Sequence, residues 1–411
     1  MTVNGIIAEY NPFHNGHHYQ LENAQSRTGA DYTIVVMSGN FMQRGTPALV
    51  DKFRRAEMAL RNGADLVLEI PAFYSVASAE YFATGATALL DKLGIVTHLC
   101  FGAECERLNI LQRMADIFVD EPLKYSEYLK EYVRQGNSFP VARAMALIRY
   151  APELSDCRDV LNSANNILAI EYLKALKKRD SQMHPVLTVR QGTDYNDRML
   201  GTHQSSALAI RQAIYDHADL SALATQIPDS AFKILCDVLS KGEPIRLNDL
   251  SEVLHYKLLS EADAGYTQYL DVSTELSDRI KNHLCDFVNF SGFCDLLKTK
   301  DITYTRVSRC LMHILLDIRE DDMAIYLQSD CIKYARVLGF RKESENLLTA
   351  LKNTSSIPLL TKLADAQKSL NEFSYEMLKK ELLISSYYGS ATAIKTGVPM
   401  VNEYRSPLVI V

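Results

Sequence analysis

Two histidines around a glycine are the residues of this sequence that most clearly suggest chemistry. Residues 10–17 read Tyr-Asn-Pro-Phe-His-Asn-Gly-His, and they lie between the strand-like run Val3–Ala8 and a helix-compatible stretch. Unpaired backbone N–H groups and the positive end of a helix dipole favour anions at such a junction. A glycine lets the backbone approach a phosphate, and the imidazoles of His14 and His17 can donate to a developing oxyanion. The segment therefore predicts a site for nucleotide phosphates.

The alternative interpretation of these histidines is a metal site. His14, His17 and His18 lie near one another, but no Cys, Asp or Glu follows at the spacing of a metal ligand. We therefore favour the phosphate site and predict no metal-ligating residues.

A second polar cluster follows the next strand-like run. Residues 37–45 read Met-Ser-Gly-Asn-Phe-Met-Gln-Arg-Gly, and Asp51, Lys52 and Arg55 come soon afterwards. Ligands of open parallel sheets bind at the edge where the strands end, so this cluster lies on the same edge as the histidines. It favours substrate binding over a plain polar loop with a capped helix.

Three further positions could meet a nucleotide, and each also has a plain structural interpretation. Gly102 ends a predicted strand, where it lets an adenine or ribose approach the backbone or simply makes a turn. Asn165 and Asn166 begin a helix, where asparagine is most often a cap. Arg190 ends another strand, where its guanidinium could grip phosphate.

The segment 205–211 reads Ser-Ser-Ala-Leu-Ala-Ile-Arg and opens a helix. Alone it would be an ordinary serine cap followed by a surface arginine. Together with the histidines it favours a phosphate clamp, because Ser206 would offer a hydroxyl at the helix N-terminus and Arg211 a charge for leaving pyrophosphate.

The elements that must position these residues alternate along the first half of the chain. Strands are predicted at Val3–Ala8, 33–37, Leu66–Ile70, 98–101 and 186–190, and helices at 17–27, 51–62, 77–93 and much of 106–178. Runs that are apolar on both faces, separated by amphipathic stretches, are typical of parallel strands covered by helices. We therefore predict an α/β fold with a Rossmann-like parallel sheet over residues 1–225, followed by a mainly α-helical domain over residues 226–411.

Composition narrows the class of protein. The chain has 411 residues, of which 47% are hydrophobic and 23% charged, as in soluble globular proteins, and its net charge of −6 argues against a uniformly basic surface but not against a local basic patch. No apolar run reaches the roughly 18 residues of a membrane span, and no secretory signal is expected. The eight cysteines are scattered without a Cys-x-x-Cys pair, which favours a reducing compartment, so we expect a cytoplasmic protein that does not contact a membrane.

With these clusters in order, the chain resembles the tRNA(Met) cytidine acetate ligase family, whose nucleotidyltransferase-like members share the His-x-Gly-His step with a wider superfamily. The matching stretches span nearly the full length: residues 8–17, 37–45, 63–71, 101–102, 165–174, 206–211, 304–309 and 334–340. One departure is Leu208, since the family usually carries Thr at that position and the chain therefore lacks a hydroxyl donor there.

The resemblance implies a reaction and its substrates. ATP and free acetate would give acetyl-adenylate and pyrophosphate, and the wobble cytidine amine of elongator tRNA(Met) would then take the acetyl group and release AMP. His14, His17 and Arg211 would be catalytic, and Mg²⁺ is expected with ATP although no dedicated carboxylate site is visible. Oligomeric state and the acetate pocket stay open.

The resemblance also implies which residues meet the nucleotide. Whether Asn165 or its neighbour is the true match stays open. The implied ATP-binding residues are Ile7, Ala8, Glu9, Tyr10, Asn11, Pro12, Phe13, His14, Asn15, Gly16, His17, His18, Tyr19, Gln20, Gly102, Asn165, Arg190 and Ser206.

Basic residues with an intervening aromatic in the C-terminal half suit RNA phosphate contact with base stacking. Such charges often merely make a helix face soluble. Because of the family resemblance, we favour a tRNA-binding surface over a plain solvated face. The predicted tRNA-binding residues are Lys298, Lys300, Arg306, Arg309 and Arg336, with Tyr304 between them.

Two rival functions remain. The same chemistry could serve another acceptor, either a protein prosthetic thiol or a cofactor precursor, but neither would need so long a helical, locally basic C-terminal part. A nucleotide-sensing RNA-binding module without catalysis is the other rival, and the intact His14, Gly16, His17 and Arg211 argue against it.

Overall fold

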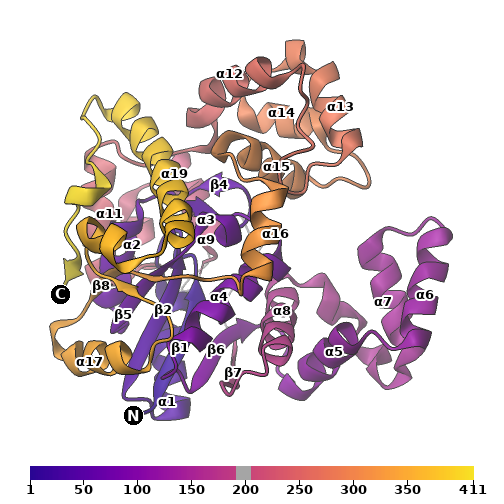
Figure 1. The fold of residues 1–411 in the computed structure, drawn as a ribbon, viewed down its shortest axis with the longest axis horizontal. Coiled ribbons are helices and arrows are strands. Elements are labelled where there is room, and N and C mark those ends of the chain that lie inside the picture. The colour runs from indigo at the N-terminus through magenta and orange to yellow at the C-terminus, as the bar shows by residue number, and fades with distance from the viewer. Residues whose placement is uncertain (191–204) are drawn as a thin grey trace.

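A twisted sheet with helices on both faces forms the centre of the molecule, and helical lobes project from it (Figure 1). The computed structural model describes residues 1–190 and 205–411, the side chains of residues 156–158 excepted. One lobe contains α5–α7, and the other contains α12–α15 and lies above the strand β4 (Figure 1). The α-helices are α1 (Asn15–Thr28), α2 (Lys52–Leu60), α3 (Ala72–Ser75), α4 (Ala79–Lys92), α5 (Leu108–Asp120), α6 (Leu123–Arg134), α7 (Phe139–Tyr150), α8 (Ala164–Lys178), α9 (Ala207–Tyr215), α10 (Leu220–Ala224), α11 (Asp229–Ser240), α12 (Ser251–Glu261), α13 (Thr274–Asn282), α14 (Phe290–Leu297), α15 (Tyr304–Leu316), α16 (Glu320–Gln328), α17 (Glu345–Thr354), α18 (Ala366–Ser369) and α19 (Glu372–Thr396).

The central sheet has, within the described residues, eight strands in the order β10-β8-β5-β2-β1-β6-β7, with β9 also paired to β8. Its pairs are parallel except β5 with β8, which is antiparallel. A separate antiparallel hairpin joins β3 to β4. The strands are β1 (Val3–Ala8), β2 (Tyr32–Ser38), β3 (Phe41–Met42), β4 (Thr46–Pro47), β5 (Leu66–Ile70), β6 (His98–Ala103), β7 (His184–Val189), β8 (Ala335–Phe340), β9 (Leu359–Leu360) and β10 (Val409–Ile410).

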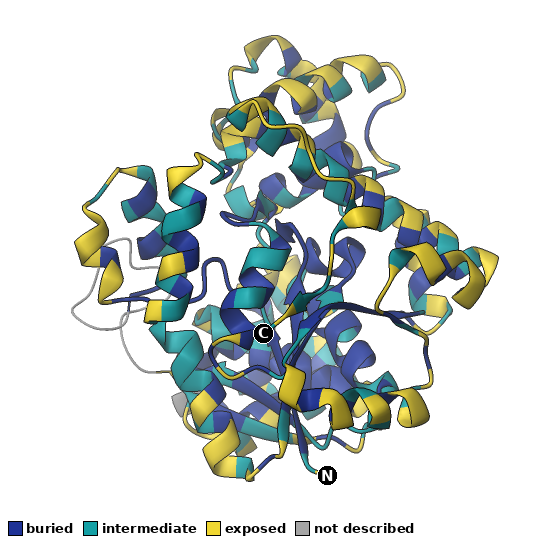
Figure 2. Cartoon of the chain, turned by 90° about the vertical axis from the view of Figure 1, so that its left-hand side faces the viewer, coloured by how far each residue is buried: buried dark blue, intermediate teal, exposed yellow. Residues whose placement is uncertain are grey.

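Successive residues of the central strands enter different hydrophobic clusters. Ile6 and Val35 belong to one cluster, whereas Ile7 and Val36 belong to the other. Side chains alternate across a strand, so the clusters lie on opposite faces of the sheet, and both faces are buried. Figure 2 shows the result: the sheet and the helix faces against it are buried, and the outer faces of the lobes are exposed. This explains why the strands are apolar on both faces.

The predicted fold class is confirmed. β1 and β5 have the predicted bounds, and the other predicted strands differ from β2, β6 and β7 by a few residues at their ends. No helix in the described parts of the chain is both long enough and apolar enough to cross a membrane.

The C-terminal half differs from the helical domain expected there, because three of its strands join the central sheet. β8 lies between β5 and β10, and its Val337 and Leu338 are buried. The sheet thus continues past β5 with chain from far along the sequence. The boundary near residue 225 stays a prediction, and the described helices α11 to α16 fill most of the interval between it and β8.

Candidate active site

A cavity of about 160 Å³ opens where β1 and β6 end and α1 begins. The segments that sequence analysis connected with nucleotide binding meet there, although they are up to about two hundred residues apart. The lining residues are Ile7, Ala8, Glu9, Tyr10, Asn11, His14, His17, Gln20, Met42, Gln43, Arg44, Thr46, Phe82, Phe101, Gly102, Asn165, Leu168, Tyr172, Arg190, Ala207, Leu208 and Arg211.

The two histidines are locked by the first turn of α1. Nδ1 of His14 accepts a hydrogen bond of 3.0 Å from the N–H of Gly16, and Nδ1 of His17 accepts one of 3.3 Å from the N–H of His14. The rings stack with their centroids 3.7 Å apart. In a neutral imidazole only one nitrogen carries a proton, so both rings hold theirs on Nε2. Both histidines can therefore donate from Nε2 to an anion in the cavity.

Their surroundings keep the histidines neutral until an anion arrives. Burial, together with the charges of Arg190 and Arg211, lowers the pKa of His14 to about 3. Burial, His14 and Arg190 hold the pKa of His17 well below its usual range. An opposite charge favours the protonated form. A bound triphosphate would therefore raise both pKa values and strengthen the donors that hold it.

Gly16 is needed here for space. Its φ is not in the left-handed region, but a Cβ at this position would lie 2.9 Å from Cε1 and 3.1 Å from Nδ1 of His14. The His14 ring folds back over residue 16 to cap the helix, and only a glycine leaves room for it there.

The rest of the predicted loop divides between lining and support. Ile7, Ala8, Glu9, Tyr10, Asn11 and Gln20 line the cavity, whereas Pro12, Phe13, Asn15, Gly16, His18 and Tyr19 are not among its lining residues. Phe13 is fully buried in the core, and Nδ2 of Asn15 donates to the carbonyl of Thr225. His18 faces Asn62 and Glu22. For these three side chains, the structure favours a supporting role over direct nucleotide contact.

The structure distinguishes the two asparagines at the start of α8. Oδ1 of Asn166 accepts from the N–H groups of Glu104 and Cys105 at 2.9 and 2.8 Å, so this buried side chain ties α8 to the end of β6. Asn165 lines the cavity, and its Nδ2 donates to Oε1 of Glu104 at 2.6 Å. Asn165 is thus the one placed to meet a ligand.

Arginines from two distant segments converge on the cavity. Arg190 follows β7 and lies against Gly102, where a Cβ would be 3.4 Å from its Cγ. Nη1 of Arg211 donates to the carbonyl of Asn11 at 2.5 Å, which fixes its guanidinium beside the histidine loop. Ser206 caps α9 through Ala209 and is not among the lining residues. The helix N-terminus nevertheless reaches the cavity through Ala207 and Leu208.

The second polar cluster contributes only in part. Gln43 and Arg44 line the cavity, and the backbone N–H of Gln43 donates to Oε1 of Glu9 at 2.7 Å. Asp51, Lys52 and Arg55 do not line it. Arg55 is fully buried and donates to the carbonyls of Glu9, Ser38, Gly39 and Val50, so it braces the ends of β1 and β2. For these three residues the structure favours a structural role over substrate contact in this cavity, because their charged groups are engaged inside the fold.

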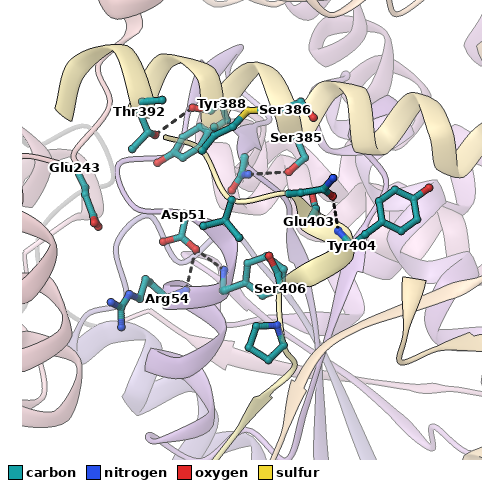
Figure 3. A pocket seen from close by; sticks show the side chains of 18 of the residues that line it. Asp51, Arg54, Glu243, Ser385, Ser386, Tyr388, Thr392, Glu403, Tyr404 and Ser406 are labelled. Atoms are coloured by element: carbon teal, nitrogen blue, oxygen red, sulfur yellow. Dashed lines mark hydrogen bonds between the residues drawn. The ribbon is translucent and has the colours of Figure 1, made fainter. Parts of the chain in front are cut away.

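Asp51 lines a different cavity of about 1340 Å³, between α2, α19 and the C-terminal tail (Figure 3). Its carboxylate accepts from the N–H groups of Phe53 and Arg54 and so caps α2. Arg54 is paired with Asp237. This cavity is larger than the one beside the histidines, but the charged groups of Asp51 and Arg54 are already engaged with other residues of the protein. We therefore do not take it as the active site.

Sequence analysis missed the apolar wall of the nucleotide cavity. Phe82 of α4, Leu168 and Tyr172 of α8, and Thr46 of β4 all line it. Tyr172 packs against Phe101 with ring centroids 5.8 Å apart. An apolar residue on an amphipathic helix signals only burial, so no local pattern could separate Phe82 from an ordinary core residue.

The predicted tRNA-binding residues fall into two groups. Lys298, Lys300 and Arg306 are exposed, and Arg309 is half-buried on α15. For Arg336 the structure favours a supporting role inside the fold over contact with tRNA. It is 7% exposed on β8, and its guanidinium is paired with Glu69 and Glu403. A buried, doubly paired arginine holds the C-terminal tail against the sheet and has no free face for RNA. Among the described residues, no cluster of three His, Cys, Asp or Glu side chains could hold a metal ion.

Comparison with known proteins shows the family to which the chain belongs. The family model described as HIGH Nucleotidyl Transferase matches residues 1–398. The tRNA(Met) cytidine acetate ligase of Halothermothrix orenii is 40% identical over 390 residues, which are 93% of this chain and 92% of that protein. That of Acetivibrio thermocellus is 39% identical over 392 residues, 94% of each chain. The chain belongs to the tRNA(Met) cytidine acetate ligase family.

Two solved structures of a similar protein superpose closely on this chain. The apo structure of Thermotoga maritima TmcAL superposes with a TM-score of 0.93 at 30% identity and covers 100% of this chain and 99% of that one. The structure of the same protein bound with alpha-thio ATP superposes with a TM-score of 0.91 at 29% identity over the whole of both chains. The Thermotoga maritima protein therefore shares the fold of this chain over its full length.

Proposed function

We propose that this protein is an ATP-dependent acetate ligase that acetylates the N4 amine of the wobble cytidine of elongator tRNA(Met). The observation that carries the proposal is full-length similarity to relatives of that name, combined with a His-x-Gly-His cavity. The alpha-thio ATP complex of the Thermotoga maritima protein supports ATP as the nucleotide. The acceptor distinguishes this proposal from other ligases of the superfamily.

In the first step an acetate oxygen attacks the α-phosphorus of ATP, and the bond to pyrophosphate breaks. Negative charge gathers on the phosphoryl oxygens as this happens. The Nε2–H groups of His14 and His17 and the guanidinium of Arg211 are proposed to stabilise it, because preorganised donors in a site shielded from water act most strongly on such charge. Arg190 and Ala207 at the N-terminus of α9 would hold the leaving phosphates.

In the second step the cytidine amine attacks the acyl carbon, and AMP leaves. No nucleophilic side chain is needed, since the adenylate is already activated. Glu9 is the carboxylate among the described lining residues, and one of its oxygens is engaged with Gln43. We therefore propose that Mg²⁺, bound with ATP, is held mainly by phosphate oxygens and water.

The proposed division of labour follows the chain. Nucleotide chemistry belongs to residues 1–225, and tRNA binding to the helical part of residues 226–411, with Lys298, Lys300, Arg306 and Arg309 on its basic surface. Of the predicted ATP-binding residues, those that line the cavity are proposed to touch ATP and the others to support them. The cytoplasm, where charged tRNA pools and ATP meet, is the proposed location.

The test uses isotopically labelled acetate, ATP and an elongator tRNA(Met) transcript, followed by mass spectrometry of the nucleosides. We expect labelled N4-acetylcytidine together with AMP and pyrophosphate. A transcript with uridine at the wobble position is the control, because uridine has no exocyclic amine. Acetate-dependent ATP–pyrophosphate exchange without tRNA labelling would mean another acceptor, and ATP binding without exchange would mean a non-catalytic module.

A further inference from the structure

The β3–β4 hairpin lies between the nucleotide cavity and the helix α15. Its residues Gln43, Arg44 and Thr46 line the cavity. Gly45, the last residue of its turn, instead lies against Ser308 and Arg309 of α15, in the lobe that Figure 1 shows above β4. One short hairpin thus contacts both the nucleotide site and the helical part that carries the proposed RNA-binding residues.

Gly45 makes the contact with α15 possible. Its φ is +71°, and a Cβ at this position would lie 2.5 Å from the backbone N of Arg309 and 2.6 Å from the carbonyl carbon of Ser308. These are backbone atoms of a helix, which cannot move aside as a flexible side chain can. The hairpin therefore rests directly on the α15 backbone, and only glycine permits so close an approach.

A buried hydrogen bond holds the hairpin in this place. The hydroxyl of Ser308, which is fully buried, donates to the carbonyl of Gly45 at 2.8 Å. On the other side, Oε1 of Glu9 accepts from the backbone N–H of Gln43 at 2.7 Å. The turn of the hairpin is thus held through Gln43 by Glu9, which follows β1, and through Gly45 by α15.

The same stretch of α15 offers positive charge to a polyanion. Arg306 is exposed two residues before Ser308, and Arg309 follows it directly. Nε of Arg309 is buried and has no hydrogen-bond partner among the described residues. An RNA phosphate at Arg306 and Arg309 would therefore bind the same turn of α15 that contacts the hairpin through Ser308.

We propose that Ser308 is a positioning residue that couples RNA binding on α15 to nucleotide binding in the cavity through the β3–β4 hairpin. The inference rests on the proposed function for the identity of the RNA. Coupling between two binding sites is reciprocal, so tRNA must tighten ATP binding by the same factor by which ATP tightens tRNA binding. ATP would then bind more tightly, and acetate would be activated preferentially, when the acceptor tRNA is already bound.

The experiment measures dissociation constants for a non-hydrolysable ATP analogue and for an unmodified elongator tRNA(Met) transcript, each alone and with the other at saturation. In the wild type we expect each ligand to tighten the other by about fivefold or more, a typical size for coupling between sites. In Ser308→Ala the Gly45 carbonyl loses its buried donor. The analogue should bind about fivefold more weakly without RNA, as for the loss of one hydrogen bond, and the coupling should fall below about twofold.

Ser251→Ala is the matched control in the same lobe. Ser251 is a buried serine whose hydroxyl also donates to a backbone carbonyl, that of Asn248, at 2.7 Å, but this bond lies within the lobe. It should keep wild-type coupling. Gly45→Ala, which crowds the contact from the hairpin side, should reproduce the Ser308→Ala result if the serine variant folds poorly.

A Ser308→Ala protein that behaves like Ser251→Ala would overturn the inference, and so would a wild type whose ligands bind independently. Failure of the proposed function would look different. It would appear as absent acetyl transfer in a wild type that still shows the coupling.

Discussion

Gly16→Ala should disable the phosphate site while leaving the fold nearly intact. The added Cβ would lie 2.9 Å from Cε1 of His14, so the His14 ring must rotate away from its capping position. The helix then loses the 3.0 Å hydrogen bond from the N–H of residue 16 to Nδ1. Loss of a helix cap costs about 1 kcal/mol of unfolding free energy.

The effect on chemistry should be much larger than the effect on stability. Rotation of the ring removes its Nε2–H donor from the cavity, and loss of one donor to a developing oxyanion lowers the rate by about 100-fold or more. Acetate-dependent ATP–pyrophosphate exchange measures that step without RNA. Chemical denaturation measures the stability change in parallel.

Gly29→Ala is the control at the other end of the same helix. Gly29 has a φ of +63° and no atom within 4 Å of an added Cβ, so this variant strains the backbone without touching the site. It should cost roughly 1 kcal/mol and leave exchange unchanged. The reasoning is refuted if Gly16→Ala keeps exchange within about twofold of the wild type, or if Gly29→Ala loses as much.

Three further predictions follow from charges and their surroundings. Lys300→Ala with Arg306→Ala should weaken tRNA binding and reduce the slope of log affinity against log salt by about 2, with exchange unchanged; an unchanged slope would exclude them as phosphate contacts. His14→Asn keeps a capping side chain but removes an imidazole whose pKa is lowered to about 3 in the folded protein. Between pH 6.5 and pH 3 this imidazole takes up a proton only in the unfolded chain, which favours unfolding. As the pH falls from 8 to 5, the unfolding free energy of the wild type should therefore drop by about 2 kcal/mol more than that of the variant. Burial raises the pKa of Glu381 to about 8, so the folded carboxyl keeps a proton that the unfolded chain releases near pH 4.5. The wild type should therefore lose stability relative to Glu381→Gln as the pH rises from 5 to 8, and plots of unfolding free energy against pH that run parallel for the two proteins would contradict this.

The parts of the site that could be predicted from the sequence are those formed by residues that follow one another in the chain. The strand β1, the turn after it and the helix α1 follow one another, so the apolar run, the histidines and the glycine identify the phosphate loop locally. Parallel strands end at one edge, and that rule places Gly102 and Arg190 at the same cavity, whereas Asn165, at the start of a helix, was implied by the family resemblance.

The parts that could not be predicted depend on partners far along the chain. β8 pairs with β5 although some 270 residues separate them, and no pattern in the sequence of β8 predicts that pairing. Arg336 has the charge of an RNA contact, but Glu69 and Glu403 neutralise it inside the fold. Similarly, Arg55 looks like a ligand residue until its four carbonyl partners are seen.

The most direct test of the central claim is a crystal structure of this protein with a non-hydrolysable ATP analogue. The account predicts that Nε2 of His14 and of His17 each lie about 3 Å from a phosphate oxygen, with Arg190 and Arg211 on the outer phosphates. Phosphates bound away from both rings, for example in the larger cavity beside Asp51 and α19, would contradict it.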